Sequence, residues 1–228
     1  MGITELWGAV LTLPDLSPLW VSLRVSGVAT TLIFVSGTAT AYGLHRYRGR
    51  GRSLVDGLLL TPLVLPPTVV GFGLLLAIGR NGPVGQLLQY GGLRLVFTWY
   101  AAVLAAVVVA FPLFYRAAIG AFEQIDPALL DAARVEGASE WAVFWHIALP
   151  LAFPGILAGT LLAFARALGE FGATLMVAGN VPGQTQTIPI AIYFAVEAGA
   201  LKESWFWTGV IVVISLTGAF VMNQLNRR

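Results

Sequence analysis

Five stretches of this chain are apolar over a length that can cross a lipid bilayer, which takes about 20 residues of helix. Their residue ranges are 19–44, 54–78, 99–119, 149–168 and 205–225. The first stretch is the weakest, because it contains Arg24 and many serines and threonines. Only 11% of all residues are charged, against about 25% in a soluble domain. The pattern therefore predicts an all-α, polytopic transmembrane helical bundle that forms one domain over residues 1–228.

A sixth stretch, residues 171–198, is apolar only in patches. Glycines, prolines and Asn180 interrupt it between residues 179 and 189. Glycine and proline both disfavour the interior of a helix, so we expect a broken or re-entrant segment here rather than a clean crossing. The total is five to six membrane segments.

The basic residues between these stretches predict the orientation, because cytoplasmic loops carry the excess of Lys and Arg. One side has Arg46, Arg48, Arg50, Arg52, Arg116, Arg134, Arg227 and Arg228, and the other has Arg80, Arg94 and Lys202. We expect the first side to be cytoplasmic, which puts the C-terminus inside the cell and the N-terminus outside. The arginine-rich loop 46–52 is interpreted as an anchor of this orientation and not as a nucleic-acid site.

The residue inventory offers little for catalysis or metal binding. The chain has no cysteine, and its two histidines, His45 and His146, are far apart with no ligand pattern around either. It also has no GxxxxGK[ST] phosphate loop, no HExxH and no GxSxG. We therefore expect no catalytic residue, no metal site and no bound cofactor, and any ATP hydrolysis has to come from a partner.

The loop between the third and fourth stretches is unusually polar and also predicts helices. Residues 122–146 hold six charged side chains. Asp126 and Pro127 are typical of a helix start, as the N-cap and the first helical residue. Residues 128–136 are rich in helix formers, and Gly137 is expected to end that helix.

A second short helix, residues 139–145, is predicted to follow, with Ser139 as its cap. It leads to Leu149 at the membrane edge. The small side chains of Ala132 and Ala133 lie in the middle of the first helix and leave room for a partner to approach closely.

This loop resembles the signature of the binding-protein-dependent ABC permeases. Their pattern is Glu-Ala-Ala, three residues, Gly, nine residues, Ile, one residue and Leu-Pro. The matching residues are Asp131, Ala132, Ala133, Gly137, Ile147, Leu149 and Pro150. Asp131 replaces the glutamate, which keeps the charge on a shorter side chain. The resemblance implies a coupling loop, about residues 122–148, that docks on a cytoplasmic ABC ATPase; the alternative is an ordinary amphipathic loop helix.

Residues 167–180 and 184–193 look like the molybdate subgroup of this family, with sulfate, thiosulfate and tungstate permeases as alternatives. The resemblance implies a homodimer that works by alternating access. Its implied partners are two ATPase subunits, which carry ATP and Mg, and an extracytoplasmic oxyanion-binding protein. A twofold dimer with the path on its axis is also the simpler physical solution, because five helices make a small bundle for a wet anion route.

Candidate pathway residues gather after the fourth stretch. Arg166 and Glu170 are spaced i and i+4, so they form either an internal ion pair or an anion-attracting and gate-positioning pair. Neutral donors follow at Thr174, Asn180, Gln184, Thr185, Gln186 and Thr187. Weak neutral sites suit conduction. The broken backbone between residues 179 and 189 forms either an outer gate or a plain hairpin.

Other features predict helix geometry. Pro62, Pro66 and Pro67 are expected to kink the second stretch, either at a transport site or merely for packing. The small-residue pairs Gly71 with Gly73 and Gly155 with Gly159 suit close helix contacts. Trp99, Trp205 and Trp207 fit an interfacial aromatic belt.

Two other classes of function compete with the permease. An autonomous ion-coupled transporter needs intramembrane relays, and few ionisable residues are present. For a membrane-embedded enzyme, the sequence contains no matching catalytic motif. Copurification of an ATPase separates the permease from both.

Overall fold

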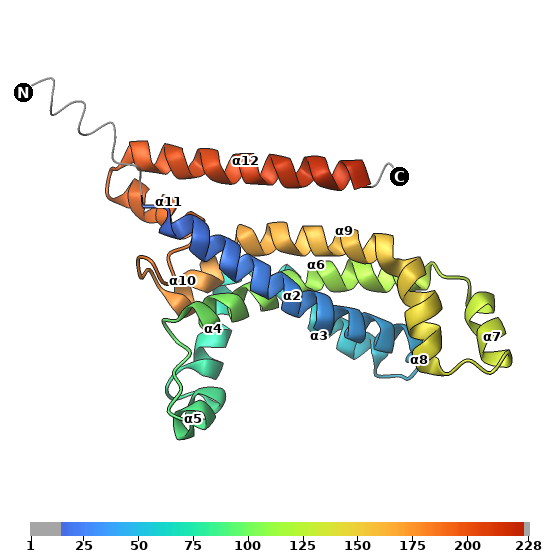
Figure 1. Ribbon diagram of the computed structural model, residues 1–228. Coiled ribbons are helices and arrows are strands. Elements are labelled where there is room, and N and C mark those ends of the chain that lie inside the picture. The colour runs from blue at the N-terminus through green and yellow to red at the C-terminus, as the bar shows by residue number, and fades with distance from the viewer. Residues whose placement is uncertain (1–14, 226–228) are drawn as a thin grey trace, which may run out of the picture.

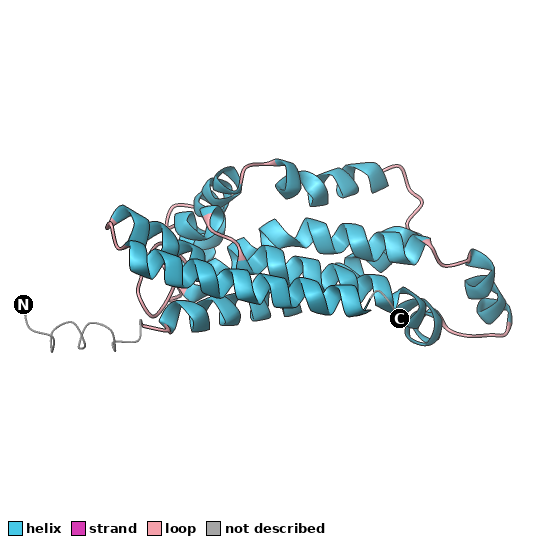
Figure 2. Ribbon diagram, turned by 90° about the horizontal axis from the view of Figure 1, so that it is seen from above, coloured by secondary structure: helices cyan, strands magenta, loops and turns pink. Residues whose placement is uncertain are grey.

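The computed structural model describes residues 15–225, and within them every regular element is a helix (Figure 1, Figure 2). The elements are α2 (Ser17–Arg46), α3 (Arg52–Val64), α4 (Pro67–Ile78), α5 (Pro83–Tyr90), α6 (Trp99–Glu123), α7 (Pro127–Val135), α8 (Glu140–Val143), the π-helix η1 (Phe144–Ala148), α9 (Leu149–Leu168), α10 (Gly172–Ala178), α11 (Ile188–Glu197) and α12 (Leu201–Leu225). The all-α prediction is confirmed.

The core lies where α2, α6 and α9 pack together. Small residues set the spacing between these helices, as expected where lipid replaces water and close backbone packing holds helices together. A Cβ on Gly155 of α9 would lie 2.5 Å from the Ala121 Cβ of α6, and one on Gly159 would lie 2.9 Å from the Ala117 Cβ. The predicted close contact of Gly155 and Gly159 is confirmed.

Four helices of the described range are long and apolar enough to cross a membrane: α2, α6, residues 140–168 and α12 up to Phe220. They confirm four of the five predicted spans. The short helix predicted over 139–145 is present as α8 and the start of η1, but it does not stand apart from the fourth span, because helical structure runs without a break from Glu140 to Leu168. No glycine or proline stands between Ser139 and Leu149 to end it.

The turn before Pro150 takes a wider form than an α-helix. Pro150 has no N–H to donate. The N–H of Leu149 bonds to the carbonyl of Phe144, five residues back, which is the π-helical pattern. Figure 1 shows the chain changing direction where this turn meets α9.

The second apolar stretch is broken, as its prolines predicted. The helices α3 and α4 form an angle of 114°, much more than a kink within one helix. The break falls at Leu65 and Pro66, both with extended backbone, and Pro67 begins α4. A residue before proline disfavours helical geometry, so two consecutive prolines stop α3. Pro62 stays inside α3. The kink predicted in the stretch 54–78 is therefore a full bend, and the helix pair is either one broken crossing or a re-entrant segment.

Residues 171–198 form two short helices, α10 and α11, joined by the segment 179–187. This confirms the broken segment predicted there. The N–H of Ile188, at the start of α11, donates to the Ser22 hydroxyl of α2 over 2.8 Å. This hydrogen bond is buried and fixes the start of α11 to α2, the first helix of the bundle.

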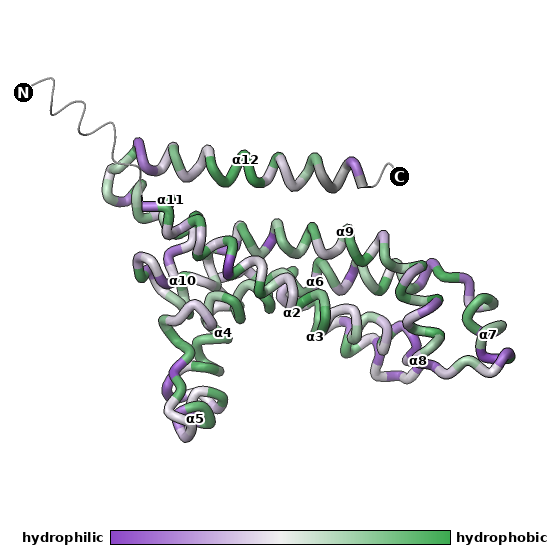
Figure 3. Tube along the Cα trace, viewed as in Figure 1, coloured by the Kyte–Doolittle hydropathy of each residue, from purple (hydrophilic) through white to green (hydrophobic). Residues whose placement is uncertain are grey.

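The last helix, α12, stands away from the bundle and contacts mainly α11 (Figure 1). Its hydropathy remains apolar along most of its length (Figure 3). Trp205 and Phe220 expose most of their side chains, whereas Trp207 is fully buried beside Ile188 and Ala191. Trp207 is thus an interior packing residue, which corrects its predicted place in the interfacial belt.

The direction of the helices matches the predicted parity. Helices α2, α6 and α12 run in one direction and α9 runs in the other (Figure 1). The arginine-rich loop after α2, the end of α6, α7 and α8 consequently gather at one end of the bundle. The start of α2 and the segment 179–187 lie at the other end. The first fourteen residues and the last three, including Arg227 and Arg228, lie outside the described residues.

Candidate functional site

The helices of the predicted coupling loop, residues 122–148, begin at the capping residues that the sequence predicted. The Asp126 carboxylate accepts a hydrogen bond of 2.9 Å from the N–H of Ala128. The helix ends at Val135, and Gly137, two residues later, has a φ of +89°, which favours glycine. The Ala138 N–H bonds back to the Ala133 carbonyl over 3.0 Å, which closes the turn by a Schellman motif. The Ser139 hydroxyl then caps α8 through the Ala142 N–H.

Ion pairs connect this loop to the transmembrane helices. Arg134 of α7 contacts Asp131 at 2.6 Å and Glu140 of α8 at 2.9 Å. Hydrogen bonds to Glu140 and Asp131 raise the pKa of Arg134. Glu140 also pairs with Arg46, at the end of α2, over 3.0 Å. Each pair is partly exposed and adds little stability by itself, so their effect is to fix the position of α7 relative to α2 and α8.

A second group of charges joins α3 to α6 at the same end. Arg52 pairs with Glu123 and, over 3.7 Å, with Asp56. The Tyr115 hydroxyl of α6 donates to Asp56. The last arginine of the loop after α2 is therefore held by side chains of the protein.

The motif residues divide into two places. Asp131, Ala132 and Gly137 are exposed on or beside α7, where a partner can reach them. Ile147 and Leu149 are half-buried against the core at the junction of η1 and α9. Ala133 is half-buried and Pro150 is exposed. The first part of the motif, at α7, is therefore mostly exposed to a partner. The second part, at the start of α9, mostly packs against the core.

The apolar side chains around α7 enlarge that surface. Val135 exposes 88% of its area, and Leu129 exposes 52%. Trp141 of α8 is also exposed, at 71%. Isolated apolar side chains are common on surfaces, and these three add apolar area beside the charged side chains of α7 and α8.

At the opposite end, Arg166 and Glu170 form the internal ion pair that the spacing allowed, with 2.8 Å between Nη1 and Oε2. Glu170 is 2% exposed. Its second oxygen accepts a hydrogen bond of 2.8 Å from the Ala173 N–H. The carboxylate therefore connects the end of α9 to the start of α10.

The predicted neutral donors differ in exposure: Gln184 is exposed, and Asn180 and Gln186 are half-buried. Thr174, Thr185 and Thr187 are buried. The Thr185 hydroxyl accepts from the Val181 N–H at 3.0 Å and donates to the Gly179 carbonyl at 3.3 Å, so it holds the segment 179–187 in shape. In the described part of the chain, the Thr187 hydroxyl has no hydrogen-bond partner, and the same is true of the Asn180 side-chain oxygen.

One residue of this end was not foreseen. Phe97 has φ of +62°, a strained backbone for a bulky side chain. Its N–H donates to the Val177 carbonyl of α10 over 2.9 Å, and its ring lies 2.9 Å from where a Cβ on Gly179 would be. Such strain has no sequence signature, and it persists only where surrounding contacts impose it.

Comparison with known proteins decides between the classes left open by this geometry. Residues 32–228 match the family described as binding-protein-dependent transport system inner membrane component. The chain belongs to this family. As a member of it, the protein is a permease subunit that spans the membrane several times, which confirms the resemblance drawn from the loop motif.

Two relatives of this permease are molybdenum transport system permease proteins ModB. The protein of Escherichia coli (strain K12) is 47% identical over 189 residues, 82% of each chain. The protein of Azotobacter vinelandii is 36% identical over 214 residues, 93% of this chain and 95% of the relative.

Solved structures share the permease fold at low identity. A bacterial alginate ABC transporter, in complex with an alginate pentasaccharide-bound periplasmic protein, superposes with a TM-score of 0.75 at 18% identity, covering 100% of this chain and 83% of that one. The inward-facing MetNI methionine ABC transporter superposes with a TM-score of 0.71 at 17% identity, covering 100% of this chain and 98% of that one.

Proposed function

We propose that this permease is the membrane-spanning subunit of an ATP-driven importer for a tetrahedral oxyanion, molybdate in the first place. The observation that carries the proposal is the exposed α7 segment, with the family spacing on it and ion pairs from Arg134 and Glu140 to the end of α2. The substrate follows from the relatives, which are named for molybdenum transport. Sulfate, thiosulfate and tungstate are the alternative cargoes.

In this mechanism α7 docks on a cytoplasmic ABC ATPase, which binds ATP and Mg. Asp131, Ala132, Ala133 and Gly137 contact that subunit. When two ATPase subunits close on ATP, their movement reaches α8 and α2 through Arg134, Glu140 and Arg46. The arginine-rich end of the bundle is cytoplasmic, and the end with segment 179–187 faces an extracytoplasmic oxyanion-binding protein.

The anion path requires a second copy of the chain. Within one protomer Thr174 and Thr185 are buried, and Arg166 is neutralised by Glu170, so none of these offers a free charge to an anion. A twofold dimer provides a path between protomers, where the segment 179–187 acts as the outer gate. Neutral side chains of that segment, such as the half-buried Asn180 amide, suit the passage of a dianion, because strong sites would trap it.

The test is ATP hydrolysis by the chain reconstituted in liposomes with its ATPase and an oxyanion-loaded binding protein. We expect molybdate-loaded binding protein to stimulate hydrolysis and uptake. Stimulation by sulfate alone would keep the permease and overturn the substrate. If no ATPase binds the chain, the coupling proposal fails and an autonomous transporter takes its place.

A matched pair of glycine variants locates the coupling. Gly137→Ala forces a side chain into left-handed backbone, which costs about 1–2 kcal/mol and distorts the turn after α7. We expect at least a several-fold loss of stimulated hydrolysis with membrane insertion unchanged. Gly120→Ala is the control, because Gly120 lies within α6 with open space around its Cα. Equal activity of both variants would show that the turn does not transmit the ATPase movement.

A further inference from the structure

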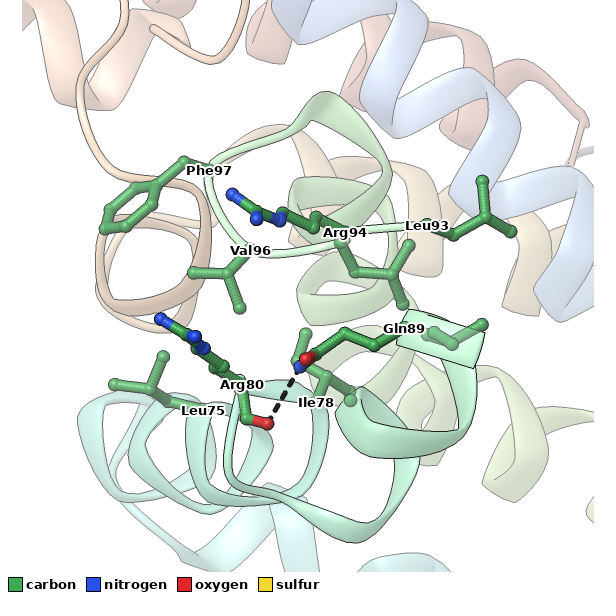
Figure 4. A pocket seen from close by; sticks show the side chains of 12 residues that line it. Leu75, Ile78, Arg80, Gln89, Leu93, Arg94, Val96 and Phe97 are labelled. Atoms are coloured by element: carbon green, nitrogen blue, oxygen red, sulfur yellow. Dashed lines mark hydrogen bonds between the residues drawn. The ribbon is translucent and has the colours of Figure 1, made fainter. Parts of the chain in front are cut away.

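The helices α4 and α5 and the segment 91–98 enclose a cavity of about 390 Å³ at the end of the bundle opposite α7 (Figure 4). Ile78 and Gly85 are buried at its base, and Leu75 and Val96 form half-buried walls. Most of the lining is apolar. A ligand that fills this space therefore needs a substantial apolar part.

Two arginines supply positive charge to this apolar cavity. Arg80 follows α4, and Arg94 lies in the segment that returns to α6, so both belong to the lining and both are exposed (Figure 4). Within residues 15–225, no carboxylate lies at ion-pair distance from either. The Gln89 amide is already used, because it donates to the Arg80 carbonyl over 2.8 Å. The charge offered to a ligand is that of two guanidinium groups.

The placement of these arginines runs against the charge distribution of the chain. Outside the predicted spans, Arg80 and Arg94 are two of the three basic residues expected on their side of the membrane, the third being Lys202. Positive residues on that side oppose the usual loop bias. Because both arginines line one cavity, they are better explained by binding a ligand than by setting the orientation of the chain in the membrane.

The aromatic side chains around the cavity are of the kind found at the depth of lipid headgroups. Tyr90 exposes 90% of its area, and Tyr100 and Phe97 expose more than half of theirs. Aromatic residues gather at the membrane–water interface. On α4, Val69 and Phe72 expose apolar side chains of the kind that lipid tails cover.

We propose that this cavity binds an anionic phospholipid, with its phosphate at Arg80 and Arg94 and part of an acyl chain against the apolar lining. A small dianion is disfavoured as the occupant, because an apolar wall offers it few hydrogen bonds for the water it loses. An uncharged lipid leaves both guanidinium groups without an anion. The proposal does not depend on which cargo the permease carries.

A lipid in this position reaches the segment 179–187. Phe97 lines the cavity and also packs against Gly179, and its backbone is bonded to Val177 of α10. A bound lipid therefore adds a contact to the residue whose strained backbone is held by α10. We expect anionic lipid to raise the thermal stability of the protein as well as to bind.

The experiment measures binding of phosphatidylglycerol and of phosphatidylcholine with the same acyl chains to the purified full chain, by native mass spectrometry. We expect wild type to prefer phosphatidylglycerol. The double variant Arg80→Gln with Arg94→Gln should bind it on the order of 25-fold more weakly, at about fivefold for each charge. Lys202→Gln is the matched control, because it removes the third basic residue of that side without touching the cavity, and it should bind as wild type does.

Three results would overturn the proposal. The first is equal binding of the two lipids, or unchanged phosphatidylglycerol binding in the double variant. The second is that glycerol 3-phosphate binds as tightly as the lipid, which would make the cavity a free-anion site. The third is a double variant that keeps its lipid but no longer responds to binding protein, which would assign the arginines to protein docking. A Lys variant at both positions should restore much of the binding if charge, and not shape, is what the arginines supply.

Discussion

At the scale of single residues, Glu170 shows how an ionised group is kept inside an apolar protein. Its carboxylate is almost fully buried and is satisfied on both sides, by Arg166 on one oxygen and by the Ala173 N–H on the other. A buried charge without a partner is expensive. The i, i+4 spacing allowed this pair to be foreseen from the sequence, but the bond to Ala173 depends on the chain turning sharply between α9 and α10.

Removing one charge of this pair should therefore change the stability of the protein by a different amount from removing the other. Arg166→Gln leaves a buried carboxylate without its cation, whereas Glu170→Gln leaves a cation whose side chain is 29% exposed. We expect Arg166→Gln to lower the free energy of unfolding by about 1–3 kcal/mol, less than for a fully buried pair because Arg166 keeps some solvent contact. Glu170→Gln should cost less.

Thermal unfolding in detergent measures both effects. The double variant, with glutamine at both positions, should recover part of the loss caused by Arg166→Gln, since no buried charge remains. Strict additivity of the two substitutions would contradict a direct interaction between these side chains.

At the scale of elements, the contact between α4 and α10 separates two glycines that look equivalent in the sequence. A Cβ on Gly71 would lie 2.7 Å from the Ala173 Cα, whereas a Cβ on Gly73 would meet nothing within 4 Å. The sequence predicted a small-residue surface at both positions. Only Gly71 uses it, because the bend before α4 turns one face of this helix toward α10.

Alanine at these two positions should separate packing from helix propensity. Gly71→Ala forces α4 away from α10, and overpacking of this kind costs about 1–3 kcal/mol. Gly73→Ala should be neutral or slightly stabilising, because alanine favours the helix. Melting temperatures of the two purified variants compare them directly, and equal values would mean that α4 does not pack on α10 as described.

Local features of the fold could be predicted from the sequence, whereas features that depend on distant contacts could not. Long apolar stretches, proline breaks and capping residues act locally, so four of the spans, the break before Pro67 and the start and end of α7 were predictable. The 114° angle between α3 and α4, the burial of Trp207 and the strain at Phe97 depend on distant contacts. For the candidate site, the motif gave the exposed face of α7 but not the ion pairs from Glu140 to Arg46.

At the scale of the whole molecule, the arrangement of helices makes the orientation testable. The loop with Arg50 and the segment with Gln184 lie at opposite ends of the bundle, and both residues are exposed. The chain contains no cysteine, so a single introduced thiol reports on one position without background.

We expect Gln184→Cys to react with a membrane-impermeant maleimide on intact cells, and Arg50→Cys to react only after permeabilisation. The physical reason is the bias of basic residues toward the cytoplasmic side. The reverse pattern of labelling would invert the proposed orientation, and with it the side on which α7 meets an ATPase.

The π-helical turn at Phe144–Ala148 has a consequence for how the protein can vary. Such a turn is equivalent to one extra residue in an α-helix, and each residue turns a helix by about 100°. That single residue therefore sets the rotation of α7 and α8 about the helix axis relative to α9. An insertion or deletion within α8 would rotate α7 relative to α9, even where every side chain of α7 is preserved, and would so misalign the surface that α7 is proposed to offer an ATPase.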